Sequence, residues 1–259
     1  MVQEETNIIE AKPDQSTGAV IDIHGLYKSF GEHNDVLKGL DLTVKKGENL
    51  VMLGKSGSGK SIIIKCLVGL VEPDKGEIKV FDTDISKLDN RALNKIRLRI
   101  GFLFQNSALY DSMTVRENLE FPLKRHSKEL SSNEVEDTVK EALESVGLAD
   151  AIDKMPSELS GGMRKRIGLA RTLILKPEIM LYDEPTTGLD TITSREISEL
   201  ILAIQKKNKT SSIIITHDMA CAKLTGDRIA ILRDGVINAQ GHYDELEKSN
   251  DEWVRSFFI

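Results

Sequence analysis

The chain has 259 residues, of which 40% are hydrophobic and 29% are charged, a composition typical of a globular protein with a substantial buried core. Its formal net charge of -6 argues against a nucleic-acid binder that works through bulk positive charge, although a local basic groove would escape this test. We therefore expect no nucleic-acid partner.

Neither a membrane span nor a secretory signal is expected. The richest apolar stretch, residues 62–71, is interrupted by Lys65 and is shorter than the ~18 apolar residues that a spanning helix requires. Residues 1–18 are polar and acidic, without the basic start and apolar centre of a secretory signal. These features predict a cytoplasmic protein.

The predicted elements begin after an N-terminal arm. Residues 1–18 show no apolar periodicity, so we expect a disordered, mobile arm there. From residue 20 onward, short apolar runs punctuated by Gly and Pro predict strands. The first five predicted strands are 21–26, 40–44, 50–53, 78–81 and 100–104.

The middle of the chain changes to helical spacing. Between about residues 106 and 176 the pattern predicts a helical insertion. Its clearest sign is one apolar stripe on a charged segment, formed by Val135, Val139, Ala142, Leu143 and Val146.

Strands return in the last third of the chain. Predicted strands at 179–182 and 213–216 flank an amphipathic helix at 194–207, an alternation typical of a parallel sheet with crossover helices. Two further apolar runs flank Arg233-Asp234-Gly235, which predicts a hairpin. Cys66 and Cys221 lie in apolar helical patterns and are expected to be buried free thiols.

A phosphate-binding loop is the first chemical motif. Residues 54–61 fit G-x-x-x-x-G-K-S/T between a predicted strand and a predicted helix, a context that disfavours an ordinary Gly/Ser loop. Backbone N–H groups and the helix N-terminus would bind the phosphates of ATP, Lys60 would bridge the outer phosphates, and Ser61 would ligate Mg²⁺. The candidate nucleotide-binding residues of this loop are Gly54, Lys55, Ser56, Gly57, Ser58, Gly59, Lys60 and Ser61. The chain shows no internal repeat, so it carries one such unit.

Two adjacent carboxylates follow the predicted strand at 179–182. A buried strand end avoids such a pair unless a cation or reacting water is near, so Asp183 and Glu184 are interpreted as a Walker B element. Two acids after a strand can otherwise mark a helix start, but the P-loop favours the catalytic interpretation. Asp183 is predicted to hold Mg²⁺, and Glu184 to polarise the water that attacks the γ-phosphate. The hydroxyl of Tyr182 needs a partner if it is buried.

Residues 159–163, Leu-Ser-Gly-Gly-Met, together with the basic segment 164–171, resemble the signature motif of the ABC-type ATPases. Ser160 can cap the following helix, while Gly161 and Gly162 expose backbone N–H groups to an anion. A Ser-Gly-Gly string alone is common in loops. The resemblance implies that this motif faces the γ-phosphate held by a second copy, so that a head-to-tail homodimer encloses two ATP molecules.

The resemblance also implies roles for isolated residues. Gln105 is similar to the residue that senses Mg²⁺ and water, so it is a candidate nucleotide and metal contact, and His217 is similar to the histidine that contacts the γ-phosphate. Residues 188–190 resemble the loop that crosses the dimer interface. Phe30, in preference to Tyr27, lies where the family places an aromatic that stacks on adenine. The predicted catalytic residues are Glu184, His217 and Lys60.

The resemblance covers about residues 20–250 and implies an α/β fold. The expected architecture is a P-loop NTPase (RecA-like) core with an N-terminal antiparallel β subdomain and an inserted ABC-specific helical subdomain. We predict an ATPase domain over residues 19–250, with the helical subdomain at about 106–176, and a short C-terminal tail at 251–259.

Local strings narrow the resemblance to the Mla-type ATPases, which energise phospholipid transport with MCE-domain proteins. These strings are residues 102–111 and 155–163, in which Met163 replaces the usual Gln, and the aromatic tail at 251–258, which could instead be a short helix that packs aromatics on the domain. The implied partners are an integral-membrane permease, docked near residues 105–122, and an MCE-domain protein. The implied location is the inner face of the inner membrane, and the implied role is outer-membrane lipid asymmetry.

Other functions remain open at this point. Within transporters, the alternative is an ATPase for lipoprotein release or small-solute import. A translation factor or a DNA-repair ATPase of the same family would be expected to carry tandem nucleotide domains or a long coiled-coil insertion, and neither pattern occurs here. A binding module without hydrolysis would be expected to lack Glu184 and His217.

Overall fold

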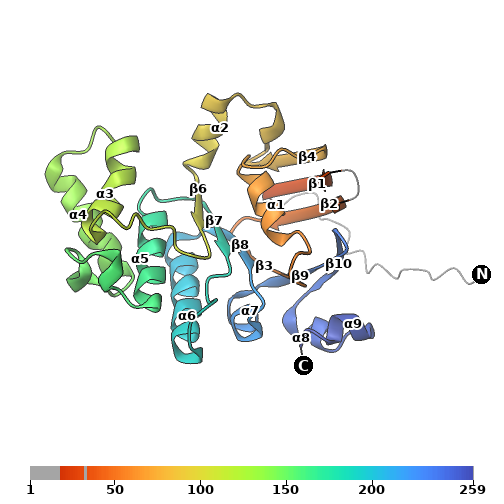
Figure 1. Ribbon diagram of the computed structural model, residues 1–259. Coiled ribbons are helices and arrows are strands. Elements are labelled where there is room, and N and C mark those ends of the chain that lie inside the picture. Colours follow the sequence, from red (N-terminus) through yellow and green to blue (C-terminus); the bar gives the residue numbers. More distant parts are fainter. Residues whose placement is uncertain (1–17, 32–33, 259) are drawn as a thin grey trace, which may run out of the picture.

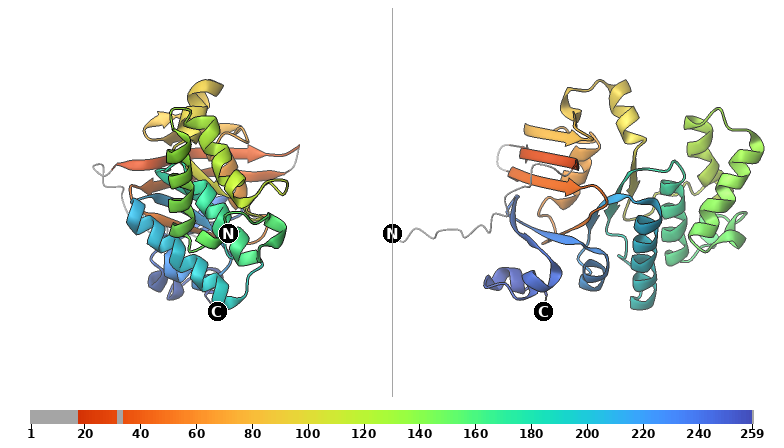
Figure 2. Two further views of the ribbon diagram at one scale, coloured as in Figure 1. Left: turned by 90° about the vertical axis from the view of Figure 1, so that its left-hand side faces the viewer. Right: turned by 180° about the vertical axis from the view of Figure 1, so that it is seen from behind.

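The computed structural model describes residues 18–31 and 34–258 (Figure 1). The predicted N-terminal arm, residues 1–18, lies outside the described residues except for Gly18. Helices α3 and α4 project at one end of the molecule, and the strands β1, β2 and β4 lie at the other end (Figure 2).

The centre of the molecule is a six-stranded sheet in the order β10-β9-β3-β8-β7-β6. The pairs from β9 to β6 are parallel, and β10 is antiparallel to β9. The strands are β3 (Asn49–Gly54), β6 (Ile100–Leu103), β7 (Ile179–Asp183), β8 (Ser211–Ile215), β9 (Arg228–Arg233) and β10 (Val236–Gly241). The hairpin turn between β9 and β10 has positive φ at Asp234 and Gly235, as a two-residue turn requires.

Helices cover both faces of this sheet, because alternate strand residues point to opposite sides. On one side, Leu50 and Met52 of β3 pack with α1 (Lys60–Leu67). On the other side, Val51 and Leu53 share a core with α6 (Thr191–Asn208) and α7 (Met219–Thr225). The continuous apolar runs of β3, β7 and β8 are therefore buried on both faces, as the alternation of strands and helices predicted.

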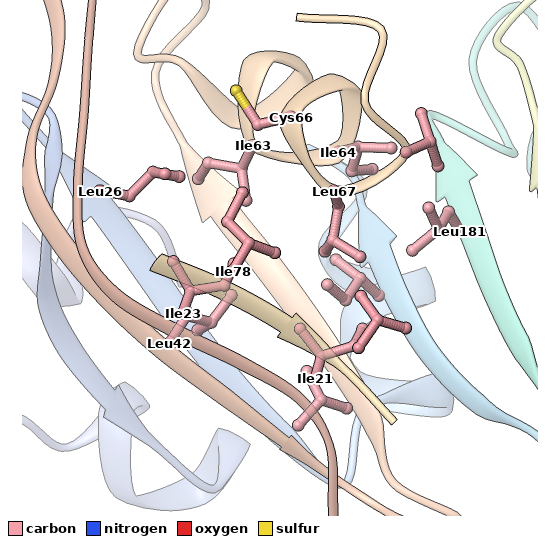
Figure 3. Packing of buried hydrophobic residues seen from close by; sticks show 14 of the residues in the cluster. Ile21, Ile23, Leu26, Leu42, Ile63, Ile64, Cys66, Leu67, Ile78 and Leu181 are labelled. Atoms are coloured by element: carbon pink, nitrogen blue, oxygen red, sulfur yellow. The ribbon is translucent and has the colours of Figure 1, made fainter. Parts of the chain in front are cut away.

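A second, antiparallel sheet has the order β2-β1-β4-β5. Its strands are β1 (Ala19–Ser29), β2 (Asp35–Lys45), β4 (Lys75–Val80) and β5 (Thr83–Asp84), and η1 (Ile85–Lys87) and α2 (Asn90–Arg97) follow them. Figure 3 shows Ile63 and Leu67 of α1 close to Ile23 and Ile78 of this sheet, so α1 packs against both sheets.

The predicted helical insertion is present between β6 and β7. It contains α3 (Val115–His126), α4 (Ser132–Ser145), η2 (Ala149–Ala151), η3 (Pro156–Glu158) and α5 (Gly161–Leu173). The helices α3 and α4 each begin with a capping box, at Thr114 and Ser131. The stripe on α4 faces a separate core, in which Val139 and Leu143 are fully buried.

The C-terminal segment folds back on the molecule. Helices α8 (Tyr243–Glu247) and α9 (Glu252–Arg255) lie in this segment. Trp253, Phe257 and Phe258 pack against the core that contains Ile229 and Ile231 of β9. The rings of Tyr243 and Phe258 meet edge to face at 5.0 Å. In this chain the aromatic tail therefore packs on its own domain.

Some boundaries differ from the sequence predictions. The predicted strand 78–81 ends at Val80, because Phe81 adopts a positive φ of 50° in the turn to β5. The helix expected after the P-loop is present and spans Lys60–Leu67, and Gly69 follows with a φ of 65°. Cys66 and Cys221 are buried free thiols, as predicted. No helix within residues 18–31 and 34–258 is long and apolar enough to span a bilayer.

Candidate nucleotide-binding site

The P-loop leads from β3 into α1. Gly57 and Gly59 have φ angles of 77° and 105°, and a side chain at Gly59 would place Cβ 2.9 Å from Val36 Cγ1. Gly59 is the N-cap of α1 and has no side chain to accept a hydrogen bond from the first turn. Ile62 N–H in that turn donates to Gly59 O at 3.0 Å, whereas the N–H groups of Lys60 and Ser61 have no acceptor among the described residues. These two groups are free for a phosphate, on which the positive end of the helix dipole also acts.

Three neighbouring parallel strands, β3, β8 and β7, end at the same edge of the sheet, where open α/β sheets bind ligands. A cavity of about 640 Å³ lies there. It is lined by Phe30, Val36, Gly54, Ser56, Gly57, Ser58, Gly59, Lys60, Ser61, Ile62, Gln105, Asp183, Glu184, Thr187, Ile215 and His217. Most predicted site residues therefore meet in one cavity.

The oxygens at the cavity floor suit Mg²⁺. Ser61 Oγ donates to Asp183 Oδ1 at 3.1 Å, and Gln105 lines the same cavity. Burial raises the pKa of Asp183, the hydrogen bond from Ser61 opposes this, and the nearby Glu184 carboxylate adds to it. A bound cation would favour the ionised carboxylate. Within the part of the chain described, no group of three or more His, Cys, Asp or Glu forms a metal cage. Mg²⁺ is ordinarily held by one or two protein oxygens together with phosphates and waters, so Ser61 and Asp183 fit it.

Lys60 is almost fully buried, and its ammonium donates to Gly54 O at 2.7 Å and Lys55 O at 3.0 Å. Burial lowers the pKa of Lys60, while the carboxylates of Glu184 and Asp183 counteract that effect. Lys55 is exposed and does not line the cavity, and its carbonyl is the acceptor of the Lys60 hydrogen bond.

Glu184 lies at the end of β7 with a φ of 54°, an uncommon conformation for this residue type. Its N–H donates to Ile215 O at 2.9 Å, which fixes it to β8. Its Oε2 lies 2.7 Å from His217 Nδ1 and accepts a hydrogen bond from Thr187 Oγ1 at 3.0 Å. Thr187 was not predicted from the sequence, because the only local signal is a hydroxyl three residues after a carboxylate. The carboxylate is therefore held between two polar side chains.

Comparison with known proteins agrees with this geometry. The sequence model of the family described as "ABC transporter" matches residues 37–187, which is more than half of the chain and includes the P-loop, Gln105, the signature segment and Glu184. The chain belongs to the ABC transporter family. It carries the ATP-hydrolysing domain of that family.

The fold of this ABC ATPase is also confirmed. A dimeric ATP-binding cassette, solved in a post-hydrolysis state with ADP and Pi, is 32% identical with a TM-score of 0.78. The match covers 86% of this chain and 98% of that chain. The P-loop NTPase core, the antiparallel β subdomain and the helical insertion are thus those of an ABC cassette.

Two relatives extend the comparison. A protein of Mycobacterium tuberculosis named "Probable ribonucleotide transport ATP-binding protein mkl" is 40% identical over 93% of this chain, which spans 66% of that relative's length. A protein of Arabidopsis thaliana named "Protein TRIGALACTOSYLDIACYLGLYCEROL 3, chloroplastic" is 38% identical over 94% of this chain and 74% of its own length.

The structure distinguishes between Phe30 and Tyr27, the two candidate adenine contacts of this ABC ATPase. Phe30 lines the cavity and is 44% exposed, so its ring is available to a base. Tyr27 does not line the cavity, and its hydroxyl packs over Gly39, where an added Cβ would lie 2.7 Å away. The geometry therefore favours Phe30.

The signature residues of this ABC ATPase do not reach the cavity of their own chain. Ser160 caps α5 by accepting a hydrogen bond from Met163 N–H at 3.2 Å, and neither it nor the two following glycines lines the cavity. Gly162 is required locally, because an added Cβ would lie 2.5 Å from Thr193 on α6. In the D-loop, Asp190 caps α6 by accepting from Ile192 N and Thr193 N.

The expectation for Tyr182 is not met. Its side chain is fully buried, and its hydroxyl has no hydrogen-bond partner among the described residues. Burial raises the pKa of this phenol. The ring lies in the apolar core that also contains Ile197 and Ile201 of α6.

Proposed function

We propose that the protein hydrolyses ATP at the interface of a homodimer and that this hydrolysis drives a membrane permease. The observation that carries the proposal is the cavity at the strand ends, where an uncapped helix N-terminus, the Ser61–Asp183 pair and the Glu184–His217 pair come together.

Each residue has a distinct part in the proposed reaction. The N–H groups of Lys60 and Ser61 and the ammonium of Lys60 would bind the phosphates, and Ser61, Asp183 and Gln105 would hold Mg²⁺. When bound, Mg²⁺ supplies positive charge that neutralises the phosphate oxygens. Glu184 would polarise the attacking water, with His217 and Thr187 orienting its carboxylate.

The position of the signature motif supports the dimer. Ser160, Gly161 and Gly162 begin α5 and form an anion site at a helix N-terminus, but they do not line the cavity of the same chain. A head-to-tail pair would bring each signature motif to the partner's P-loop. A solved relative at 32% identity is itself dimeric.

Glu184→Gln tests the hydrolytic proposal. The amide cannot take a proton, so we expect turnover of ATP to fall by ~10² to 10⁴-fold while ATP binding persists. Turnover is measured by phosphate release, and binding by equilibrium titration with Mg²⁺-ATP. Unchanged turnover would remove Glu184 from the mechanism.

The permease is proposed to dock near residues 105–122. Three aromatic side chains at or beside this segment are at least 36% exposed, namely Phe104, Tyr110 and Phe121. Exposed aromatics are enriched where proteins bind each other. In this proposal the protein sits peripherally on the inner face of the inner membrane.

For the cargo we propose phospholipid, moved together with an MCE-domain protein and contributing to outer-membrane lipid asymmetry. One support is the similarity of residues 102–111 and 155–163 to the Mla-type ATPases. The other is the Arabidopsis thaliana relative, whose name includes that of a diacylglycerol glycolipid. The alternative is a small solute, which the name of the mycobacterial relative favours.

We also propose the domain limits 19–250 for the ATPase, about 106–176 for its helical part, and 251–259 for the tail.

The cargo is tested by purifying the tagged protein from detergent-solubilised membranes and identifying its partners and lipids by mass spectrometry. A permease with an MCE-domain protein and bound phospholipid is expected. A solute permease without lipid would replace the phospholipid proposal and leave the ATPase proposal unchanged.

A further inference from the structure

Lys165 is a buried lysine outside the predicted site. It lies on α5, five residues after the cap Ser160, and its exposed fraction is 5%. Its ammonium donates to Gln105 O at 2.5 Å and to Glu184 O at 3.1 Å. One side chain thus joins the signature helix to the backbone of two residues assigned to the nucleotide site.

The same face of α5 holds the segment that follows Gln105. Arg171 donates to Ser107 O at 3.1 Å and Ala108 O at 2.8 Å. Gly168, between the two cations, allows Ser107 to approach, because a Cβ on Gly168 would lie 2.8 Å from that of Ser107. Residues 165, 168 and 171 are three apart and share one side of the helix. The backbone of 105–108 is therefore attached to α5 at three carbonyls.

The unusual backbone conformation of Glu184 is held by hydrogen bonds. Its φ of 54° is unfavourable for a residue with a side chain, and conformations of this kind persist where the surroundings over-determine them. The N–H is held by Ile215 O, the carboxylate by His217 and Thr187, and the carbonyl by Lys165. Among these contacts, only that of Lys165 comes from the helical insertion.

The buried positive charge of Lys165 lies near opposite charge. A buried ammonium is costly unless it is hydrogen-bonded and near opposite charge. Burial lowers the pKa of Lys165, and the carboxylates of Glu184 and Asp183 oppose that shift. Arg164, the preceding residue on α5, is exposed, whereas Lys165 is buried.

We propose that Lys165 is a positioning residue that sets the Glu184 backbone relative to α5 and Gln105, so that a shift of the helical insertion alters the placement of the Glu184 carboxylate. This inference rests on the proposed catalytic role of Glu184. It extends that role by naming the contact through which the signature helix acts on it.

The test compares Lys165→Met, which keeps the length and removes the donors, with Lys165→Gln, whose amide can still donate. We expect Lys165→Met to lower kcat by ~10- to 100-fold and to change the KM for ATP by less than about threefold, because a misplacement of about 1 Å slows the chemical step without removing phosphate contacts. Lys165→Gln should recover part of kcat. Lys206→Met, an exposed lysine on α6, is the matched control and should behave as the parent.

A double mutant separates positioning from general damage. If Lys165 acts through Glu184, adding Lys165→Met to Glu184→Gln should lower the residual turnover by less than about threefold. A full multiplicative loss would overturn the proposal, as would a Lys165→Met kcat within about twofold of the parent. If the Met variant does not fold, the Gln variant is judged by the same cycle. Retained turnover in Glu184→Gln alone would instead refute the proposed function.

Discussion

Nδ1 of His217 lies 2.7 Å from Oε2 of Glu184, although the two residues follow different strands, β8 and β7. The strands are parallel neighbours, with Asp183 opposite Ile215, so both side chains leave the same edge of the sheet. The contact places an imidazole and a carboxylate on one wall of the cavity that also contains the P-loop.

His217→Ala should therefore lower ATP turnover by about 10²-fold, because the Glu184 carboxylate loses a partner that orients it. ATP binding should change far less, since the P-loop is untouched. Phosphate release at saturating ATP is the measurement, and His126→Ala, at the exposed end of α3, is the control. Equal turnover in parent and His217→Ala would show that the 2.7 Å contact has no catalytic part.

Removal of Mg²⁺ should abolish turnover, and Asp183→Asn should shift the Mg²⁺ dependence to higher concentration by ~10-fold or more, because a carboxylate is replaced by a neutral oxygen donor. Turnover is titrated against free Mg²⁺ at constant ATP, with EDTA as the zero point. If the Mg²⁺ titrations of the parent and of Asp183→Asn coincide, Asp183 does not belong to the metal site.

Two inactive variants should complement each other when mixed. In a head-to-tail dimer, Ser160→Arg damages the partner's nucleotide site and Glu184→Gln damages its own, so a mixed dimer retains one intact site of two. With random pairing, about a quarter of the parent activity is expected. Subunits are mixed in varied ratios under conditions that allow exchange. Activity that stays at the level of the separate variants would argue against the shared site.

Tyr182→Phe should leave stability unchanged or raise it by about 1 kcal/mol, because it removes a buried hydroxyl that has no partner. Tyr182→Ala should instead cost about 3–5 kcal/mol, since it leaves a cavity in the core. Urea unfolding of both variants against the parent gives the comparison. A clear fall in the free energy of unfolding of Tyr182→Phe would show that the Tyr182 hydroxyl is hydrogen-bonded in solution.

Much of the fold could be predicted from local pattern. The P-loop predicted the junction of β3 and α1, and the stripe on α4 predicted its buried face, because both depend on residues close together in the chain. The sequence Asp234-Gly235 likewise predicted the hairpin, and both residues have the positive φ that such a turn requires. The end of β4 was missed by one residue, because the positive φ of Phe81 has no sequence signal.

By itself the sequence determined the order of strands and helices, the phosphate-binding loop and the carboxylates that end β7, since apolar period, glycine spacing and motif order are local properties. Only the tertiary structure decided that Thr187 and His217 hold Glu184 and that Lys165 binds the carbonyls of Gln105 and Glu184. Those contacts join segments far apart in the chain. They form because parallel strands end at one edge and α5 packs beside it, and neither distance nor burial is encoded in a residue's immediate neighbours.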